Sequence, residues 1–376
     1  MEQHGENPRH KVFIIIPARL ASSRLPNKLL RDLAGKPLIL HTLEQAKKAR
    51  GVEGVIVAAD SEEIYKIVEE RGQRAVLTSP AHQSGSDRIA EVARNLPENS
   101  IIVNVQGDEP LISPATIEKA VAAILQDDSA DIATTCEPIH DWKDVLSPDV
   151  VKVVTDEKDF ALYFSRSPIP YPRDEVKKFG SLEKALRDEP SLLAHYRKHT
   201  GLYVFRREFL LKFTKLAQTT LEKAEMLEQL RALENGARIK VVEVVESSIG
   251  VDTPEDFERV KKILEARQII YREAAFEDIA AIAGIHVESW RKSFAGIAPK
   301  EFLDGMSIEK RIEAFEQNFN GKAFYKMFVA ETADNKIVGF ADFGETRGRN
   351  SFDAELYAIY FLAEFQRKGI GGGLFR

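Results

Sequence analysis

Short, almost continuous apolar runs alternate with helical patterns along this chain, and this alternation constrains its fold more than any other feature. Residues 12–16, 55–59 and 101–105 form three such runs, and residues 61–71 and 114–125 have the spacing of amphipathic helices. A strand without a polar face must be covered on both sides, which is typical of parallel strands packed between helices. The alternation therefore predicts an α/β fold with a mostly parallel, doubly wound sheet.

The same alternation continues to about residue 267. It predicts further strands near 131–137, 150–154, 201–205 and 239–245, and helices near 181–187, 221–235 and 254–264. In open sheets of this kind, ligands bind beyond the carboxyl ends of the strands. The loops at 17–28 and 106–110 follow two of the expected strands, so they are the first places to look for a binding site.

A second pattern of strands and helices begins near residue 268. It predicts a strand at 269–272, a helix over 276–294, and three strands at 326–331, 336–343 and 354–362. A chain of 376 residues is also too long for one ordinary core. We therefore expect a polar tail at 1–10, an α/β domain at 11–267 and a smaller, partial α+β domain at 268–376.

The composition excludes several classes of protein. A net charge of −6 argues against a nucleic-acid scaffold, which usually presents a basic face. The single cysteine, Cys136, cannot form a disulfide framework, as is usual in a reducing cytoplasm. Residues 1–10 are polar, and no run reaches the roughly 20 apolar residues of a membrane helix. We expect a cytoplasmic protein with no membrane insertion and no nucleic-acid partner.

The loop after the first strand concentrates groups that bind phosphate. Arg19, Arg24 and Lys28 supply three cations within twelve residues, and Ser22 and Ser23 supply two hydroxyls. Arginine and lysine neutralise phosphate oxygens, and small residues let backbone N–H groups approach them. The spacing is not that of a Walker loop. Composition alone also allows a solvated basic loop with no ligand.

Two acidic turns are candidates for a magnesium site. Asp108 lies in the turn at 106–110 after the third strand, and Asp252 lies in the segment 250–256. Mg²⁺ is commonly held by one or two carboxylates together with phosphate oxygens and water. An ordinary turn explains the first segment as well, and an ordinary helix start explains the second. Spacing alone does not bring the two aspartates together.

Seven motifs, taken together, resemble one enzyme family. They are PAR-x-x-S-x-RLP-x-K, HQSGSDR, NVQGDEP, LYFSRSPIP, KHTGLY, EMLEQLR and GVDTPED, and they follow one another between residues 11 and 267. In this order they resemble the CMP-Kdo synthetases, or 3-deoxy-manno-octulosonate cytidylyltransferases. The resemblance implies a Rossmann-like nucleotide-diphospho-sugar transferase fold, CTP and the acidic sugar Kdo as substrates, Mg²⁺ as cofactor, and a homodimer.

The resemblance also implies roles for the matching residues on the nucleotide side. Arg19 and Lys28 would hold the CTP phosphates, and Asp108 and Asp252 would hold the magnesium. The residues that would shape the phosphate loop or lie near the nucleotide are Ser22, Ser23, Arg24, Arg88 and Gln106. Together they would neutralise charge during transfer of CMP, with no covalent nucleophile.

On the sugar side, the residues that the resemblance places at the pocket are Arg166, His199, Glu222, Glu225 and Gln229. The implied reaction transfers CMP from CTP to the anomeric hydroxyl of Kdo, giving CMP-Kdo and pyrophosphate for lipopolysaccharide synthesis. The residues identify no general base. Two alternatives stay open, which are activation of a related acidic sugar (8-amino-Kdo or a nonulose) and a non-catalytic sugar-nucleotide binder.

The second domain carries a glycine loop. The strand at 354–362 leads into a Q-x-x-G-x-G sequence at 366–371, whose backbone N–H groups suit a pyrophosphate. With Trp290 in the preceding helical part and a hairpin around 334–336, the segment 268–376 resembles the GNAT family of N-acetyltransferases. The acetyl-CoA contacts implied by this resemblance are Gln366, Arg367, Lys368, Gly369, Ile370 and Gly371.

The GNAT fold continues past this loop with further helices and strands, for which residues 372–376 leave no room. We therefore expect an incomplete acetyltransferase domain that binds acetyl-CoA weakly or not at all. The remaining alternative is an N-acetyltransferase whose first domain only binds a sugar nucleotide. The complete set of phosphate and magnesium residues in the first domain argues against that alternative.

Overall fold

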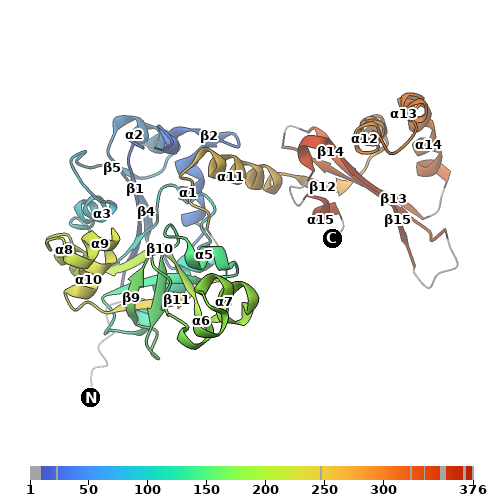
Figure 1. Cartoon of the computed structure of the whole chain (residues 1–376). Helices are drawn as coiled ribbons and strands as arrows, with labels where there is room; N and C mark the ends of the chain where they lie inside the picture. Colours follow the sequence, from blue (N-terminus) through green and yellow to red (C-terminus); the bar gives the residue numbers. More distant parts are fainter. Residues whose placement is uncertain are drawn as a thin grey trace, which may run out of the picture. The chain divides into compact units, whose positions relative to one another are not determined.

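The chain divides into two compact units, and the boundary lies between Phe257 and Glu258 (Figure 1). The structure is a computed structural model that describes residues 10–22, 24–245, 248–321, 324–333, 335–347, 353–366 and 370–374. The division falls within helix α11 (Pro254–Arg267), which the sequence pattern assigned wholly to the first domain. The domain boundary at residue 267 therefore stays a prediction.

A nine-stranded mixed sheet forms the centre of the first unit. Its main path runs β11-β7-β10-β6-β1-β4-β5, and β8 pairs with β10 and β9. The strands are β1 (Val12–Ala18), β4 (Gly54–Ala59), β5 (Ala75–Leu77), β6 (Ile101–Asn104), β7 (Ile132–Pro138), β8 (Lys152–Thr155), β9 (Ala161–Ser165), β10 (Arg197–Arg206) and β11 (Ile239–Glu243). The parallel pairs are β1 with β4, β1 with β6, β4 with β5 and β11 with β7. The antiparallel pairs are β10 with β6, β7 and β8, and β8 with β9, so the predicted α/β class is confirmed and the sheet is mixed.

Strand β10 runs antiparallel to β6, β7 and β8, a direction that the apolar pattern did not predict. It also starts four residues before the expected strand, and its register shifts between His199 and Tyr203. Gly201, inside this shift, has φ 75°, a conformation that favours glycine. The irregularity changes which side chains of the KHTGLY segment face the ligand side of the sheet.

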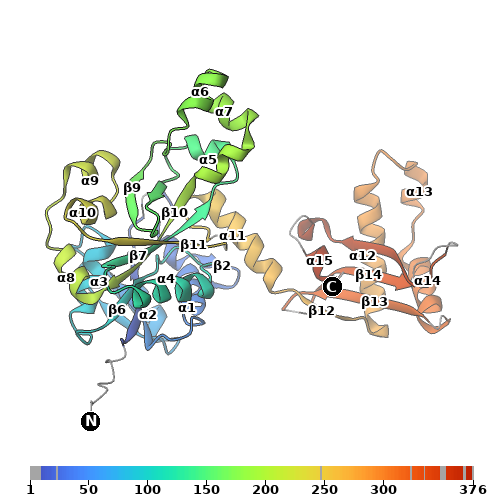
Figure 2. The ribbon, with the colours of Figure 1, turned by 90° about the horizontal axis from the view of Figure 1, so that it is seen from below.

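Helices cover both faces of this sheet, as Figure 2 shows. They include α1 (Leu38–Ala46), α2 (Glu62–Glu69), α3 (Gly85–Ala93), α4 (Pro114–Gln126) and α8 (Arg207–Phe213). Phe13 and Ile15 of β1 pack in one cluster with Ile89 of α3, while Ile14 and Ile16, which alternate with them, are also fully buried. Burial on both faces explains why β1 is a continuous apolar run.

The helix expected over 221–235 is in fact two helices. They are α9 (Thr220–Glu225) and α10 (Gln229–Glu234). Met226 follows α9 with φ 53°, in the left-handed region, and this ends the first helix. The break lets α10 start in a new direction, with Glu228 and Gln229 at its amino end.

Three short helices form a separate cluster at one end of the first unit (Figure 2). They are α5 (Trp142–Leu146), α6 (Arg173–Phe179) and α7 (Leu182–Asp188). Val145, Leu186 and Tyr196 belong to their small apolar core. This cluster lies beyond β9 and β10, and the proline-containing segment 165–173 leads from β9 into it.

The second unit contains a four-stranded antiparallel sheet in the order β12-β13-β14-β15. The strands are β12 (Ile270–Glu273), β13 (Tyr325–Glu331), β14 (Ile337–Gly344) and β15 (Glu355–Phe361), and the helices are α12 (Ile279–Ser293), α13 (Lys300–Asp304), α14 (Ile308–Gly321) and α15 (Gly371–Leu374). Ile282, Phe315 and Phe340 belong to one buried core that joins α12 and α14 to the sheet. The four strands predicted for this part of the chain are present, and Asp334 of the expected hairpin lies outside the described residues.

Within the described parts of the chain, no helix combines the length and the apolar character needed to cross a membrane.

Candidate active site

Lys28 joins three segments that are far apart in the sequence. Its ammonium group donates hydrogen bonds to Asp108 Oδ2 at 2.5 Å and to Asp252 Oδ1 at 2.8 Å. It also donates to the carbonyl oxygen of Val251 at 3.0 Å. The structure therefore brings together the basic loop after β1, the acidic turn after β6 and the segment before α11, which spacing alone did not place near one another.

The parallel pairing of β1 and β6 explains part of this meeting. Their carboxyl ends lie at the same edge of the sheet, so the loops that follow them are neighbours. Gly107 packs closely against the first loop, because a Cβ atom there would lie 3.0 Å from the carbonyl oxygen of Pro17, a tight contact. The N–H of Val251 donates to the carbonyl oxygen of Asp108 at 2.9 Å, which attaches the third segment.

The helix start at 253–256 and the ion pair of Asp252 are both present. Thr253 and Asp256 form the cap, since Asp256 N–H donates to Thr253 Oγ1 at 3.1 Å and Thr253 Oγ1 donates to Asp256 Oδ2 at 2.9 Å. The carboxylate of Asp252 points instead to Lys28 and to Arg24, whose Nη2 lies 2.9 Å from Asp252 Oδ2. An ordinary helix start therefore does not account for Asp252.

Charge and burial oppose each other in this cluster. Burial alone would lower the pKa of Lys28, but Asp108 and Asp252 raise it overall. Burial alone would raise the pKa of Asp252, but the hydrogen bond and the charge of Lys28, with those of Arg24, lower it overall. Lys28 and Asp252 are therefore charged at neutral pH, as binding a phosphate or a cation requires.

The two aspartates fit a magnesium ion. Both carboxylates bind the same ammonium group, so they are close enough to each other to share a small cation as well. Among the described residues, no group of three or more His, Cys, Asp or Glu side chains has the arrangement of a metal site. Magnesium needs fewer protein ligands, because phosphate oxygens and water complete its octahedron.

A cavity of about 310 Å³ opens beside this cluster. The predicted nucleotide-side residues that line it are Arg19, Ser22, Arg24, Lys28, Arg88, Gln106, Asp108 and Asp252. Ser23 lies outside the described residues. His82, Gln83 and Ser84 also line the cavity, and sequence reasoning missed them although it quoted their motif. Ser84 caps α3 by accepting the N–H of Asp87 at 3.1 Å, a helix start that the motif's S-x-x-D spacing signals.

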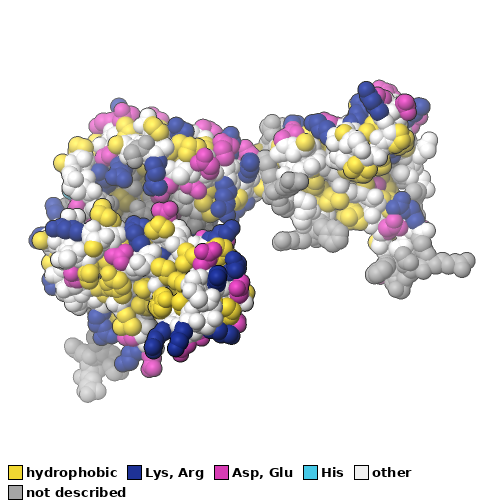
Figure 3. Space-filling view, viewed as in Figure 1, with side chains coloured by type: hydrophobic (Ala, Val, Ile, Leu, Met, Phe, Trp, Pro, Cys, Tyr) yellow, Lys and Arg dark blue, Asp and Glu magenta, His cyan; other side chains and the backbone are white. Residues whose placement is uncertain are grey.

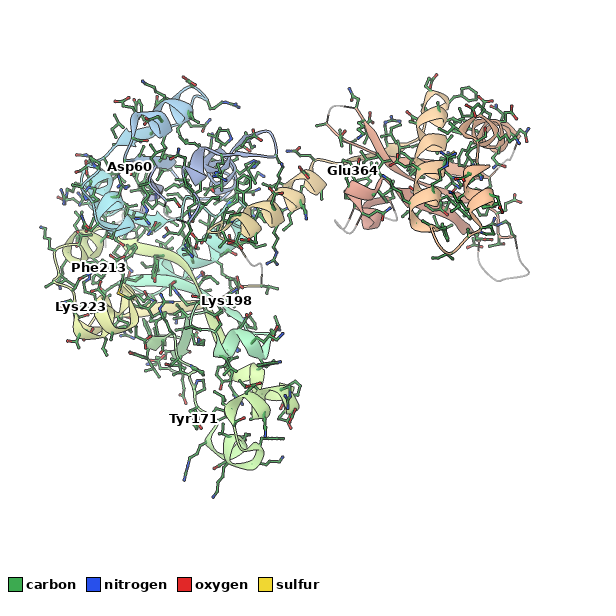
Figure 4. All side chains as sticks on the ribbon, turned by 45° about the horizontal axis from the view of Figure 1, so that its top comes forward. Asp60, Tyr171, Lys198, Phe213, Lys223 and Glu364 are labelled. Carbon is green, nitrogen blue, oxygen red and sulfur yellow. The ribbon has the colours of Figure 1, made fainter. Side chains whose placement is uncertain are left out.

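Arg88 lines the cavity from a buried position. Its Nη1 donates to Thr78 Oγ1 at 2.7 Å, and its Nη2 lies 3.8 Å from Asp60 Oδ2. Asp60, labelled in Figure 4, directly follows β4. Burial lowers the pKa of Arg88, while Asp60 opposes that shift. Arg88 thus ties the start of α3 to the end of β4 and adds positive charge to the wall of the cavity.

A second cavity, of about 90 Å³, shares Gly85 and Gln106 with the first. Gln229, predicted on the sugar side, lines it. Sequence reasoning missed its other polar residues, Ser86, Asn104, Tyr203 and Glu228. Asn104 and Tyr203 are direct neighbours across β6 and β10, a pairing that only the antiparallel direction of β10 produces. The carboxylate of Glu228 accepts a hydrogen bond from Ser86 Oγ at 2.7 Å.

His199 lies beside the second cavity. Its ring packs 5.3 Å from that of Tyr203, which lines the cavity, and 5.0 Å from that of Phe164. Its Nε2 is 2.8 Å from Thr134 Oγ1. Burial lowers the pKa of His199 to about 4, so the imidazole is neutral at pH 7. A neutral histidine suits a hydrogen-bonding role better than an ionic one.

Arg166 and Glu225 bind each other. The backbone N–H of Arg166 donates to Glu225 Oε2 at 2.9 Å, and its Nε donates to the carbonyl oxygen of Glu225 at 2.7 Å. Glu222 is buried and bound to Arg231, with donor–acceptor distances of 2.9 and 2.7 Å. These contacts hold α9 and α10 in place, and the predicted sugar contacts of the three residues stay predictions.

The glycine loop of the second unit is described only in part. Gln366 Nε2 donates to the carbonyl oxygen of Phe361 at 2.9 Å, and the carbonyl oxygen of Ile370 accepts from Tyr271 Oη at 3.0 Å. Gly371 begins α15. Arg367, Lys368 and Gly369 lie outside the described residues. The acetyl-CoA contacts therefore stay a prediction.

Comparison with known proteins agrees with both sequence resemblances. A family model described as cytidylyltransferase matches residues 13–239, and the acetyltransferase (GNAT) family model matches residues 287–376. The 3-deoxy-manno-octulosonate cytidylyltransferase of Geobacter sulfurreducens is 51% identical over 254 residues, which cover 68% of this chain and 99% of that protein. The protein of the same name from Geobacter metallireducens is 50% identical over 259 residues, which cover 69% of this chain and 100% of that protein.

A solved structure shares the fold of the first part of the chain. It is CMP:2-keto-3-deoxy-manno-octonic acid synthetase complexed with CTP, which is 40% identical in sequence. The match covers 68% of this chain and 98% of that one, with a TM-score of 0.61. The similarity is therefore to the full length of these relatives.

Proposed function

Because the chain belongs to the 3-deoxy-manno-octulosonate cytidylyltransferase family, we propose that it transfers CMP from CTP to the anomeric hydroxyl of Kdo and releases pyrophosphate. The observation that carries this proposal is the meeting of Lys28 with Asp108 and Asp252 at the wall of the larger cavity. This cluster supplies both a cation for phosphate and a carboxylate pair for magnesium.

In the proposed reaction, the anomeric oxygen of Kdo attacks the α-phosphorus of CTP, and the bond from that phosphorus to pyrophosphate breaks. Arg19, Arg24 and Lys28 line the cavity and bind the negatively charged phosphate oxygens. Charge neutralisation and alignment are the main sources of rate in phosphoryl and nucleotidyl transfer. The hydroxyl proton leaves as the new bond forms, and we assign it no protein base.

We assign the magnesium to Asp108 and Asp252. When bound, the ion would supply positive charge to the non-bridging oxygens of the reacting phosphate. Lys28 lies between the two carboxylates and keeps them at one place. The basic loop therefore both positions the magnesium ligands and contributes its own charge to the phosphates.

We assign the acidic sugar to the smaller cavity, which adjoins the larger one through Gly85 and Gln106. Gln229 and Tyr203 line this cavity, and His199 packs against Tyr203. A sugar with many hydroxyl groups needs such neutral donors and acceptors. The chemically related sugars 8-amino-Kdo and a nonulose are the alternative substrates for the smaller cavity.

Pyrophosphate release, measured for each of CTP, UTP, ATP and GTP with each of Kdo, 8-amino-Kdo and a nonulose, tests the proposal. We expect the highest kcat/KM with CTP and Kdo, and no turnover after magnesium is removed with EDTA. Equal turnover with ATP, or full activity in EDTA, would contradict it. A higher kcat/KM with another acidic sugar would reassign the substrate but keep the nucleotide chemistry.

We further propose a cytoplasmic homodimer, since CTP is a cytoplasmic nucleotide and apolar side chains remain exposed on the first unit. Leu162 of β9 is 62% exposed and Met226 is 76% exposed. Figure 3 shows hydrophobic side chains gathered over the half of the first unit that carries β9. Sedimentation of the chain, with Leu162→Glu as the variant, tests this, and a monomeric wild-type chain would contradict it.

For the second unit, we propose that acetyl-CoA binds weakly or not at all. The described part of its glycine loop uses Gln366 and the carbonyl group of Ile370 in contacts within the unit. Titration calorimetry of the full chain with acetyl-CoA is the test. Micromolar binding would contradict the proposal and would restore acetyl transfer as a second activity.

A further inference from the structure

Lys152 is a buried lysine that the proposed reaction does not use. Its side chain is fully buried at the first position of β8. Its Nζ donates to three backbone carbonyl oxygens, those of Ser147 at 2.9 Å, Val150 at 2.6 Å and Arg166 at 2.5 Å. Burial of an ammonium group is costly unless hydrogen bonds satisfy its N–H donors.

The geometry requires the charged form of this lysine. Three acceptors surround Nζ, and only the ammonium group has three N–H donors. Burial lowers the pKa of Lys152, and the nearby carboxylate of Glu225 opposes that shift. The side chain is therefore a buried cation that is hydrogen-bonded to carbonyl groups of separate segments.

These segments carry Arg166 and His199, which the family resemblance places at the sugar pocket. Lys152 pairs with Ser165 at the end of β9 and with Lys198 of β10, which is labelled in Figure 4. The carbonyl oxygen of Val151, one residue before Lys152, accepts the N–H of His199 at 2.9 Å. One buried ammonium group thus lies where β8, β9 and β10 meet.

The backbone of Arg166 is fixed from both directions. Its N–H donates to Glu225 and its carbonyl oxygen accepts from Lys152. Its side-chain Nη1 donates to the carbonyl oxygen of Pro148 at 2.8 Å, within the turn whose Ser147 and Val150 carbonyls also bind Lys152. Removal of the ammonium group therefore loosens both the end of β9 and the turn that holds the Arg166 side chain.

We propose that Lys152 is a positioning residue for the acidic sugar. It holds the turn at 147–150, the end of β9 and the start of β10 in one arrangement, and thereby fixes the backbone of Arg166 and the position of His199, whose ring packs against Tyr203 at the smaller cavity. The proposal rests on the proposed function, because it takes Kdo as a substrate and the smaller cavity as its site. A lysine that acted only on stability would leave the ratio of sugar affinity to nucleotide affinity unchanged.

Chemical rescue of Lys152→Ala tests this role. We expect the KM for Kdo to rise about tenfold or more, and the KM for CTP to change less than about twofold, since misplacement of positioning groups is costly. Ethylammonium, which has three N–H donors, should lower the KM for Kdo again. Tetramethylammonium, which has the same charge and no N–H donor, should not. The matched control is Lys158→Ala, which replaces an exposed lysine of the same β8–β9 hairpin and should behave as wild type.

The proposal would be overturned by equal changes in the KM values for Kdo and CTP, by no change in either, or by equal rescue with ethylammonium and tetramethylammonium. If Lys152→Ala does not fold, Lys152→Met fills the same space without the charge and gives the same comparison of KM values. Hydrogen exchange at the amides of Arg166 and His199 tests the positioning without any turnover. Faster exchange in the variant supports it even if the unaltered chain fails to use Kdo, and unchanged exchange overturns it.

Discussion

The nucleotide side and the sugar side of the first unit are held together in different ways. On the nucleotide side, partly exposed charges from three loops meet at Lys28. On the sugar side, buried groups bind one another, as Lys152 does with backbone carbonyls and Glu222 with Arg231. We expect a charged ligand to replace the exposed ion pairs around Lys28. The buried contacts of Lys152 and Glu222 must persist for the site to keep its shape.

This difference separates residues that touch substrates from residues that support them. Asp108 and Asp252 line a cavity, so we expect their substitution to act on the reaction. Glu222 faces Arg231, so its substitution acts on the structure first. The predictions below, taken from the largest expected effect to the smallest, test whether this separation holds.

The largest effect is expected on the nucleotide side. Asp108→Asn and Asp252→Asn should each lower kcat by about 100-fold or more, on the order of 3 kcal/mol, because each removes one charged ligand for magnesium. Both variants should unfold at nearly the wild-type temperature. Asp128→Asn, whose side chain is 92% exposed, is the control. Near wild-type kcat in Asp252→Asn would mean that Asp252 serves only the loop before α11.

A smaller and more selective effect is expected at His199. His199→Ala should raise the KM for Kdo about tenfold and leave the KM for CTP nearly unchanged, because the neutral ring supports the sugar side alone. Steady-state kinetics with each substrate varied in turn give the two values. His195→Ala, at an exposed histidine, is the control. A change confined to the KM for CTP would place His199 on the nucleotide side.

Burial of His199 should also appear in the pH dependence of stability. Its pKa is lowered from 6.5 to about 4, so the unfolded chain binds the extra proton between these values and the folded chain does not. The free energy of unfolding should therefore fall as the pH drops from about 6.5 to 4, by on the order of 1–3 kcal/mol from this residue. Urea unfolding at several pH values should show a weaker dependence in His199→Gln, and an equal dependence would refute the assignment.

The smallest effect is expected from removal of the second domain. A chain that ends at Arg267 should keep cytidylyltransferase activity within about threefold, because every residue assigned to CTP or Kdo precedes it. A chain that ends at Phe257 is the matched comparison, and it should be less stable because it cuts α11 after its first four residues. Loss of activity in the longer of the two would show that residues 268–376 support the first unit.

Much of the fold follows from local pattern. The runs that became β1, β4 and β6 are almost continuously apolar, since helices cover both faces, and this makes parallel strands visible without any tertiary information. The direction of β10 was not visible, because an apolar strand of either direction has the same sequence pattern. The break at Met226 was hidden for a similar reason, as methionine is an ordinary helix residue that here has φ 53°.

For the site, the sequence by itself determined which groups are present. The basic loop, Asp108, Asp252 and Gln229 were all identified from motifs, and the structure places them around two adjoining cavities. The sequence could not reveal Asn104 and Tyr203 as neighbours, because their pairing depends on strand direction. Nor could it reveal that Glu222 is buried and bound to Arg231.

The tertiary structure alone decided where each charge goes. Lys28 and Asp252 are 224 residues apart, yet the distance between Lys28 Nζ and Asp252 Oδ1 is 2.8 Å, because a backbone hydrogen bond from Val251 to Asp108 attaches the last loop to the sheet edge. The same holds for Lys152, which a sequence presents as an ordinary polar residue at a strand start. An ammonium group can donate to any nearby acceptor, and in this fold the acceptors around Lys152 Nζ are three carbonyl oxygens. Residue chemistry is local, but the partner of a charge is set by the fold.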